Sequence, residues 1–285
     1  MALPPTVSIA NGLFVQRGFQ VGEPFLRTLA VKHGAGVRPV DFGAGRSAKR
    51  TIDEWARVQT ADRIKEVFKD LASDTKLVLA NAVYLKADWT EPFHDIGKQG
   101  FTRADGTTVQ ADTMSRIGEM RYLATATGQA VEVPYAHSDL AMWILVPTGG
   151  AAPDGLLSPD TLDAIAGGFA STPLSLVMPH WDFETRPELV SALKAMGLTA
   201  PFEDADFSGI APGLFISDAV HAANITVDET GTEAAAVAAI AMPDSAPAQP
   251  EIEVRADRPF AFAIVHLPTR TPLFIGRVAD PTATT

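Results

Sequence analysis

Strand patterns run through almost the whole chain and are interrupted by helical patterns in no regular order. The clearest strand is LVLANAVYLK, residues 77–86, where apolar side chains hold nearly every second position. The clearest helix covers residues 23–33, with Pro24 in its first turn and Gly34 just past its end. The elements mix without strict βαβ alternation, and no internal repeat is present. The sequence therefore predicts an α+β fold with a large, mainly antiparallel sheet system and surrounding helices.

Shorter patterns fill the rest of the chain. A helix is predicted from a Ser47 cap, with Ile52, Trp55 and Val58 at helical spacing. Another is predicted over 187–196, and 149–168 is expected to be loop with a short helix. The remaining predicted strands are residues 6–16, 37–42, 129–134, 140–146, 174–178, 214–217, 219–227, 260–266 and 273–278.

Composition excludes several classes of function. The 285 residues include 23 Lys and Arg against 34 Asp and Glu, a net charge of −11, which argues against a nucleic-acid or membrane partner. The absence of Cys excludes a disulfide scaffold, thiolate zinc, iron–sulfur clusters and a cysteine nucleophile. The six His have no metal-ligand spacing, and no hydrolase, metalloprotease or phosphate-loop motif occurs. We therefore expect no metal, no cofactor, no catalytic residues and no enzyme; a hydrolase triad among the many Ser, Asp and His is the open alternative, although nothing in the sequence singles one out.

Two polar residues interrupt apolar rows on strands. Asn81 shares its parity with Leu79 and Val83, and His221 shares its parity with Ile225. A buried amide or imidazole needs a hydrogen-bond partner. The economical interpretation is that Asn81 and His221 satisfy each other; the alternative is two separately satisfied core residues.

Residues 227–254 are the most unusual part of the chain. From Thr232 to Met242 the segment holds one charge and almost only small residues, and three prolines then favour an extended stretch. One interpretation is an Ala-rich surface helix that Thr232 caps and Pro243 ends.

The other interpretation is that VDETGTEAAA resembles the hinge of a serpin, where E-x-G-T-E-A-A-A precedes a bait for proteases. Four stretches fall in the serpin order: residues 77–93, 206–210, 219–229 and 256–281. The resemblance implies one serpin-like domain over residues 1–285, with a reactive loop at about 229–254. It starts at the family's second sheet-A strand, without the usual N-terminal helices and one sheet-B strand. The implied hinge residues are Glu229, Gly231, Thr232, Glu233, Ala234, Ala235 and Ala236, and the implied shutter and breach residues are Asn81, Trp89, His180 and His221.

The resemblance also implies a function. A serpin inhibits as a suicide substrate, trapping a serine or cysteine protease when its cleaved loop inserts into the central sheet. Family spacing from Glu229 places the reactive bond at Ser245–Ala246, with Asp244 as the alternative, and implies a serine protease that prefers a small residue. His180 stands where a basic partner of Glu229 is usual, and the bait lacks Arg and Lys. The family favours a monomer outside the cell, although the chain shows no signal peptide. The alternative is a non-inhibitory serpin-like binding protein or an inactive fragment.

Overall fold

The computed structural model describes residues 5–33, 36–68, 71–187, 189–203, 205–211, 214, 216, 219–232 and 250–283. Internal contacts divide the chain into two compact units. Unit 1 comprises Met1–Thr6, Leu85–Phe183 and Ile225–Thr284, and unit 2 comprises Val7–Tyr84, Glu184–Asn224 and the last residue. Whether the chain acts as one domain stays a prediction. The described residues form a six-stranded and an eight-stranded sheet, which confirms the α+β class.

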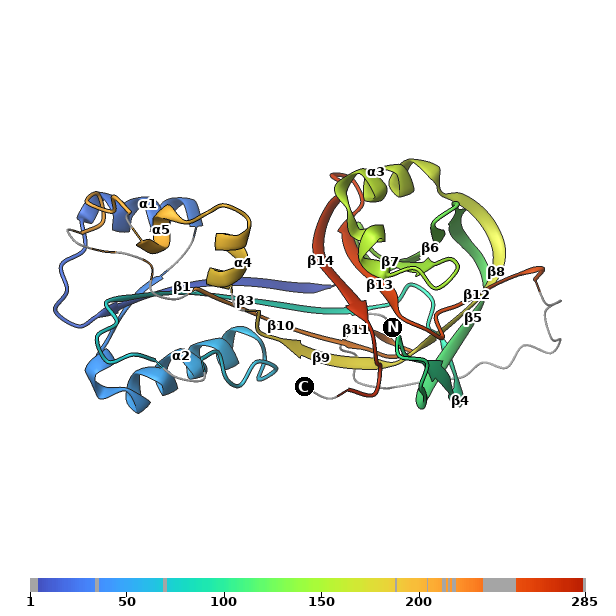
Figure 1. The fold of residues 1–285 in the computed structure, drawn as a ribbon, viewed down its shortest axis with the longest axis horizontal. Coiled ribbons are helices and arrows are strands. Elements are labelled where there is room, and N and C mark those ends of the chain that lie inside the picture. The colour runs from blue at the N-terminus through green and yellow to red at the C-terminus, as the bar shows by residue number, and fades with distance from the viewer. Residues whose placement is uncertain are drawn as a thin grey trace. The chain divides into compact units, whose positions relative to one another are not determined.

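Unit 2 holds most of the six-stranded sheet, whose order is β2-β1-β3-β11-β10-β9. Helices α1 and α2 lie on opposite faces of its strands (Figure 1). Ile52 and Trp55 of α2 pack on Phe14 and Val78, since the apolar stripe of the helix meets the apolar parity of the strands. The elements are β1 (Thr6–Gln16), α1 (Glu23–His33), β2 (Gly36–Val40), the 3₁₀ helix η1 (Phe42–Ala44), α2 (Arg46–Gln59), β3 (Leu77–Asp88), α4 (Leu189–Ala195), α5 (Ala200–Glu203) and β10 (Ala219–Val227).

Strands β3 and β10 pair in parallel over five residue pairs, from Leu79 with Ala219 to Val83 with Ala223. Beyond this stretch, in unit 1, the two-residue strand β11 (Gly231–Thr232) pairs antiparallel with both β3 and β10. β11 thus separates β3 from β10 at Ala87 and Asp88, whereas the two strands pair directly from Leu79 to Val83.

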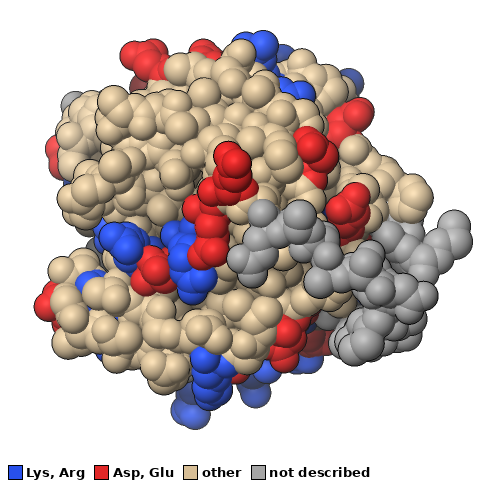
Figure 2. Space-filling model, turned by 90° about the vertical axis from the view of Figure 1, so that its right-hand side faces the viewer, with Lys and Arg blue, Asp and Glu red and all other residues tan. Residues whose placement is uncertain are grey.

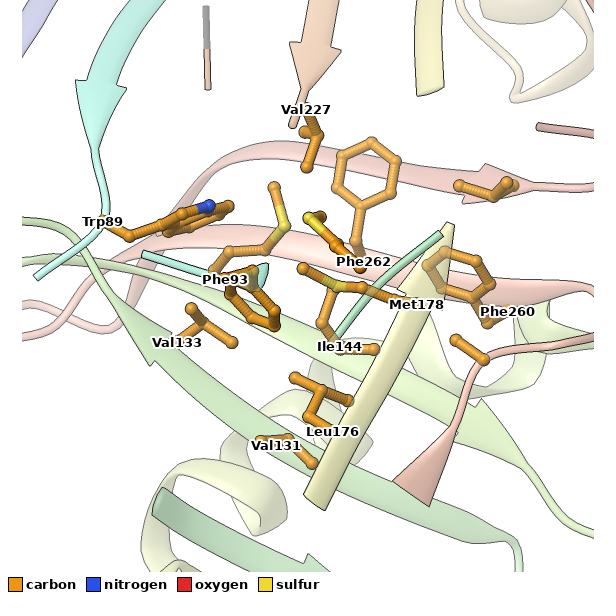
Figure 3. Close-up of a cluster of buried hydrophobic side chains, with 14 of the residues drawn as sticks. Trp89, Phe93, Val131, Val133, Ile144, Leu176, Met178, Val227, Phe260 and Phe262 are labelled. Atoms are coloured by element: carbon orange, nitrogen blue, oxygen red, sulfur yellow. The ribbon is translucent and has the colours of Figure 1, made fainter. Parts of the chain in front are cut away.

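Unit 1 is built on the eight-stranded sheet, of order β12-β8-β5-β6-β7-β13-β14 with β4 beside β5. One face packs a large apolar cluster that includes Met178 and Phe262, shown in Figure 3. The other face is covered by α3, whose Ile165 packs against Trp143 and Ala263. The elements are β4 (His94–Thr102), β5 (Thr108–Ala124), β6 (Gly128–Pro134), β7 (Leu140–Pro147), the 3₁₀ helix η2 (Pro153–Leu157), α3 (Pro159–Gly168), β8 (Ala170–Pro179), β9 (Trp181–Thr185), β12 (Ile252–Arg255), β13 (Phe260–His266) and β14 (Thr271–Val278).

Local details of the sequence prediction need correction. Helix α2 begins at Arg46 after Gly45, so Ser47 lies inside the helix and does not cap it. Val58 is 68% exposed, because the buried stripe of α2 continues from Ile52 and Trp55 to Ala56, and a residue two positions after Ala56 lies outside that stripe. The predicted strand over 214–217 is not seen at 214 and 216, and its other two residues lie outside the described part.

The surface mixes charges of both signs. Figure 2 shows acidic and basic side chains interspersed with broad uncharged areas on one face. Among the described helices, none has both the length and the apolar character needed to cross a bilayer.

Candidate functional site

The predicted hinge begins with a tight turn that follows β10. Asp228 Oδ1 accepts hydrogen bonds from the amides of Thr230 at 2.8 Å and Gly231 at 3.1 Å, and from Thr230 Oγ1 at 2.6 Å. The Asp228 amide donates to Gly231 O at 3.0 Å. Such an aspartate turn reverses the chain within a few residues, and it delivers Gly231 and Thr232 to the sheet as β11.

Gly231 lies where a side chain cannot fit. A Cβ atom added there would overlap Ala87 O and lie 2.8 Å from Asp88 Cα, so only glycine allows β11 to approach β3 this closely. The hinge glycine of the sequence motif therefore has a steric reason in this structure.

Thr232 is already buried in the sheet, with 1% of its surface exposed. Its Oγ1 lies 2.6 Å from the hydroxyl of Tyr135, which is itself 1% exposed. Burial raises the pKa of Tyr135 far above its ordinary value, so the phenol stays protonated, and the two hydroxyls form a hydrogen bond in which either can be the donor. Thr232 is thus already part of the sheet, and its hydroxyl has a buried partner.

Trp89 holds the turn from the side of β3. Its Nε1 donates to Asp228 O at 3.0 Å, and its amide donates to Thr230 O at 2.9 Å. The amide of Phe93 donates to Glu229 O at 2.8 Å. The Trp89 ring stacks on Tyr135 with centroids 4.5 Å apart, and both Trp89 and Phe93 lie in the apolar cluster of unit 1 (Figure 3).

His180 faces Glu229, as the sequence predicted. His180 Nε2 lies 3.2 Å from Glu229 Oε1, within ion-pair distance. The two groups are not aligned for a hydrogen bond, so buried Nε2 has no hydrogen-bond partner among the described residues. The neighbouring Nε1 of Trp181 is also buried without one in this part of the chain. The contact is therefore a polar pair with unused hydrogen-bonding capacity.

Asn81 and His221 meet in unit 2. His221 Nδ1 lies 2.7 Å from Asn81 Oδ1, and Asn81 Nδ2 donates to Asn11 Oδ1 at 3.0 Å and Ala10 O at 3.4 Å. Those two acceptors orient the amide, so the imidazole must carry its proton on Nδ1 and donate it to Asn81. Burial lowers the pKa of His221 and so favours the neutral ring.

The face that carries Asn81 differs from the expectation. Next to Asn81, the buried residues of β3 are Val78, Ala80 and Ala82, whereas Leu79 is 39% exposed; nearer the ends of the strand, Leu77 and Leu85, which share the parity of Asn81, are buried as well. The buried parity is the one that α2 covers, and Asn81 lies on the opposite and more open face. Periodicity found the two polar residues, but around Asn81 the face that it predicted to be buried is the more open one.

Three residues of the site were missed from the sequence. Asp228 had a usable signal, since Asp followed by Gly three positions later is typical of a turn. Tyr135 and Arg116 had none. Arg116 is buried: its Nη1 donates to Glu91 O at 3.2 Å and its guanidinium lies over Phe93, while desolvation lowers its pKa against the opposing effect of the Glu91 carboxylate.

Residues 233–249 of the predicted reactive loop lie outside the described residues, whereas its last residues, 250–254, are described and lead into β12, which pairs in parallel with β8. The part outside includes hinge residues Glu233, Ala234, Ala235 and Ala236 and reactive-bond candidates Asp244, Ser245 and Ala246. Across the described part of the chain, no group of three or more His, Asp or Glu could hold a metal ion.

Comparison with known proteins gives a consistent picture. The family model described as serpin, serine protease inhibitor, matches residues 3–281. An uncharacterized serpin-like protein of Thermococcus kodakarensis is 37% identical over 281 residues, which cover 95% of this chain and 66% of that protein. Human neuroserpin is 32% identical over 296 residues, which cover 96% of this chain and 71% of neuroserpin.

Solved structures agree. Human thyroxine-binding globulin, complexed with thyroxine, superposes with a TM-score of 0.88 at 27% identity, over 98% of this chain and 76% of that one. Serpin48 of the insect Tenebrio molitor gives a TM-score of 0.84 at 28% identity, over 97% and 76% of the two chains. The chain thus spans about two thirds to three quarters of these relatives. With its hinge glycine against β3, its Asn81–His221 pair and a family match over nearly its whole length, the chain belongs to the serpin family.

Proposed function

We propose that the chain is a protease inhibitor that works as a suicide substrate, by inserting its cleaved loop into the six-stranded sheet. The observation that supports this most is the position of β11. Gly231 and Thr232 lie between β3 and β10 and run antiparallel to both, so they are the first two residues of a possible new central strand.

The covalent step belongs to the target protease. Its serine oxygen attacks the carbonyl carbon of Ser245, the Ser245–Ala246 C–N bond breaks, and the new amine of Ala246 leaves with a proton from the protease's base. The protease stays attached to Ser245 as an ester. The hinge can then lengthen β11, and the β3–β10 pairs from Leu79 onward must separate to admit it.

Side-chain size favours that insertion. Positions that share the inward parity of Thr232 are Ala234, Ala236, Ala238, Ile240 and Met242. Small side chains pass between strands without steric cost, whereas each new backbone hydrogen bond nets only about 1 kcal/mol, close to the entropy lost in ordering one residue. Burial of Ile240 and Met242, roughly 1.5–3 kcal/mol each, therefore favours the inserted state.

The reactive bond assignment follows the family spacing, which puts Ser245 at the seventeenth residue counted from Glu229 (245 − 229 + 1 = 17). A small Ser at this position fits an elastase- or subtilisin-like serine protease. Asp244 is the alternative, for an aspartate-specific protease. Mass spectrometry of the cleaved loop distinguishes the two, and a cut outside residues 242–247 contradicts both.

The test of the function is a denaturing gel of the monomeric protein mixed with a small-residue-specific serine protease. Wild type is expected to give a covalent complex that survives denaturant. Ala234→Arg would bury an unpaired guanidinium on insertion, at a cost of several kcal/mol, so only cleaved chain should appear. Ala235→Arg is the matched control, because its parity points the other way, and it should still form the complex. Absence of the complex in wild type contradicts the inhibitory function.

A second candidate is a non-inhibitory binding protein, favoured by the likeness to a relative whose structure holds thyroxine. Heat stability separates the two functions. An inhibitor gains stability when its loop is cut, since the loop then joins the sheet, and a passive binding protein shows no such gain.

A further inference from the structure

A cavity of about 560 Å³ lies in unit 1, away from the hinge. Its walls come from four segments: the end of β4, the loop from β7 to η2, the link before β13, and the end of β14. Most of the lining is apolar, which is usual for sites that bind small molecules. The apolar lining residues are Ala104, Pro147, Ala151, Ala152, Pro153, Pro259 and Ala279.

Contacts between distant segments hold these walls in place. The amide of Thr102 donates to Asp257 O at 2.8 Å, which ties the end of β4 to the link before β13. Arg103 binds Asp280 through Nε at 2.7 Å and Nη2 at 2.6 Å, and Asp280 also accepts from the amide of Thr282. The cavity is therefore preformed, and Arg103 is occupied as part of its frame.

Two other arginines line the cavity with donors to spare. Arg258 uses Nε to bind its neighbour Asp257 at 3.1 Å, and Arg277 uses Nη1 to bind Asp154 at 3.0 Å. The Arg277–Asp154 pair is about 60% exposed on both sides. Exposed ion pairs contribute little free energy, so a ligand can exchange for them at low cost. A guanidinium accepts a carboxylate through two parallel hydrogen bonds, which leaves each arginine able to bind one.

The charge balance limits the ligand. The three arginines of the cavity carry three positive charges. Asp154 in the lining, with Asp257 and Asp280 beside it, carries three negative charges in total. A multiply charged anion such as a diphosphate would displace several aspartates and face their charge, whereas a single carboxylate displaces one. The prolines and alanines offer contact to an apolar body.

We propose that this cavity binds a small amphipathic carboxylate: a single carboxylate received by Arg258 and Arg277, with an aromatic or aliphatic body resting on the proline and alanine walls. The site uses no residue of the hinge or the reactive loop. A failure of the inhibitory function would therefore not contradict this binding site, and a failure of binding would not contradict the inhibitory function.

The test is isothermal titration of the full chain with 2-naphthoate as the probe. Saturable binding of one probe per chain is expected, with a dissociation constant below about 1 mM. The neutral amide, 2-naphthamide, should bind at least about tenfold more weakly, or about 1.4 kcal/mol. Affinity should fall between about 0.05 and 0.3 M salt, because the recognition is ionic.

Variants locate the site. Arg258→Gln/Arg277→Gln should weaken 2-naphthoate binding at least about tenfold, since both carboxylate donors are gone. Arg57→Gln is the matched control: it removes one charge from an exposed, ion-paired arginine of α2 in unit 2, and it should leave affinity within about twofold. Ala152→Trp keeps every arginine and should abolish binding by filling the cavity.

The proposal is overturned if wild type shows no saturable binding, if the amide binds as well as the carboxylate, or if the arginine and tryptophan variants bind like wild type. All four positions are solvent-exposed, and circular dichroism of each variant checks that it folds.

Discussion

The buried hydroxyl pair of Thr232 and Tyr135 predicts how firmly the hinge is docked in the sheet. Thr232→Val keeps the shape of the side chain but removes its hydroxyl, which lies 2.6 Å from Tyr135 OH. Because Tyr135 is 1% exposed, water cannot reach its hydroxyl, which in the variant has no hydrogen-bond partner in place of Thr232 Oγ1. An unsatisfied buried hydroxyl costs about 1–3 kcal/mol, which should shift the equilibrium toward an undocked hinge by roughly 5- to 150-fold.

Hydrogen exchange of backbone amides measures this equilibrium. The amides of Trp89 and Phe93 donate to Thr230 O and Glu229 O, so they exchange only when the turn leaves the segment that follows β3. We expect both to exchange faster in Thr232→Val by the factor above. Thr226→Val is the matched control: its hydroxyl binds Asp182 at 2.8 Å in an exposed contact on β10, and its loss should change exchange by less than about twofold.

A double-mutant cycle refutes or supports the reasoning. Replacing both partners by apolar groups of similar shape removes the unsatisfied hydroxyl. In Thr232→Val/Tyr135→Phe, the amides of Trp89 and Phe93 should therefore exchange more slowly than expected if the free-energy changes of the two single variants simply added. If the effects simply add, or if Thr232→Val exchanges like wild type, the hydroxyl pair does not hold the hinge.

Three further predictions concern the same sheet. Gly231→Ala should expel β11, since a Cβ would lie 2.8 Å from Asp88 Cα; proteolysis of the hinge should quicken, and unchanged proteolysis would contradict the steric argument. Cleavage of the reactive loop should raise the midpoint of thermal unfolding, as measured by calorimetry, and an unchanged midpoint would favour a binding protein. Burial lowers the pKa of His221 below its ordinary value of 6.5, so the unfolded chain binds more protons at pH values between the two. Stability should therefore fall as pH drops below about 6.5, and His221→Gln should flatten this part of the profile; an equal slope in both proteins would show that His221 does not titrate as argued.

Much of the fold was predictable because its signals are local. Helix 23–33 was found with its exact bounds, since its first-turn proline and the glycine that follows it act on neighbouring residues. Strands 6–16 and 219–227 were also found with their bounds. Local signals failed at Val58 and on the Asn81 face, where a distant element decides which side is covered.

For the candidate site, the sequence by itself singled out a small-residue motif as the predicted hinge and predicted that Asn81 and His221 need partners, because such a motif and an unsatisfied polar group are properties of the chain alone. Only the tertiary structure decided that Thr232 is already docked, because its partner Tyr135 lies 97 residues away. The same holds for the cavity, whose arginines stand at residues 103, 258 and 277. Contacts between residues so far apart leave no periodic trace in the sequence, since periodicity reports the geometry of one element and not the identity of what packs against it.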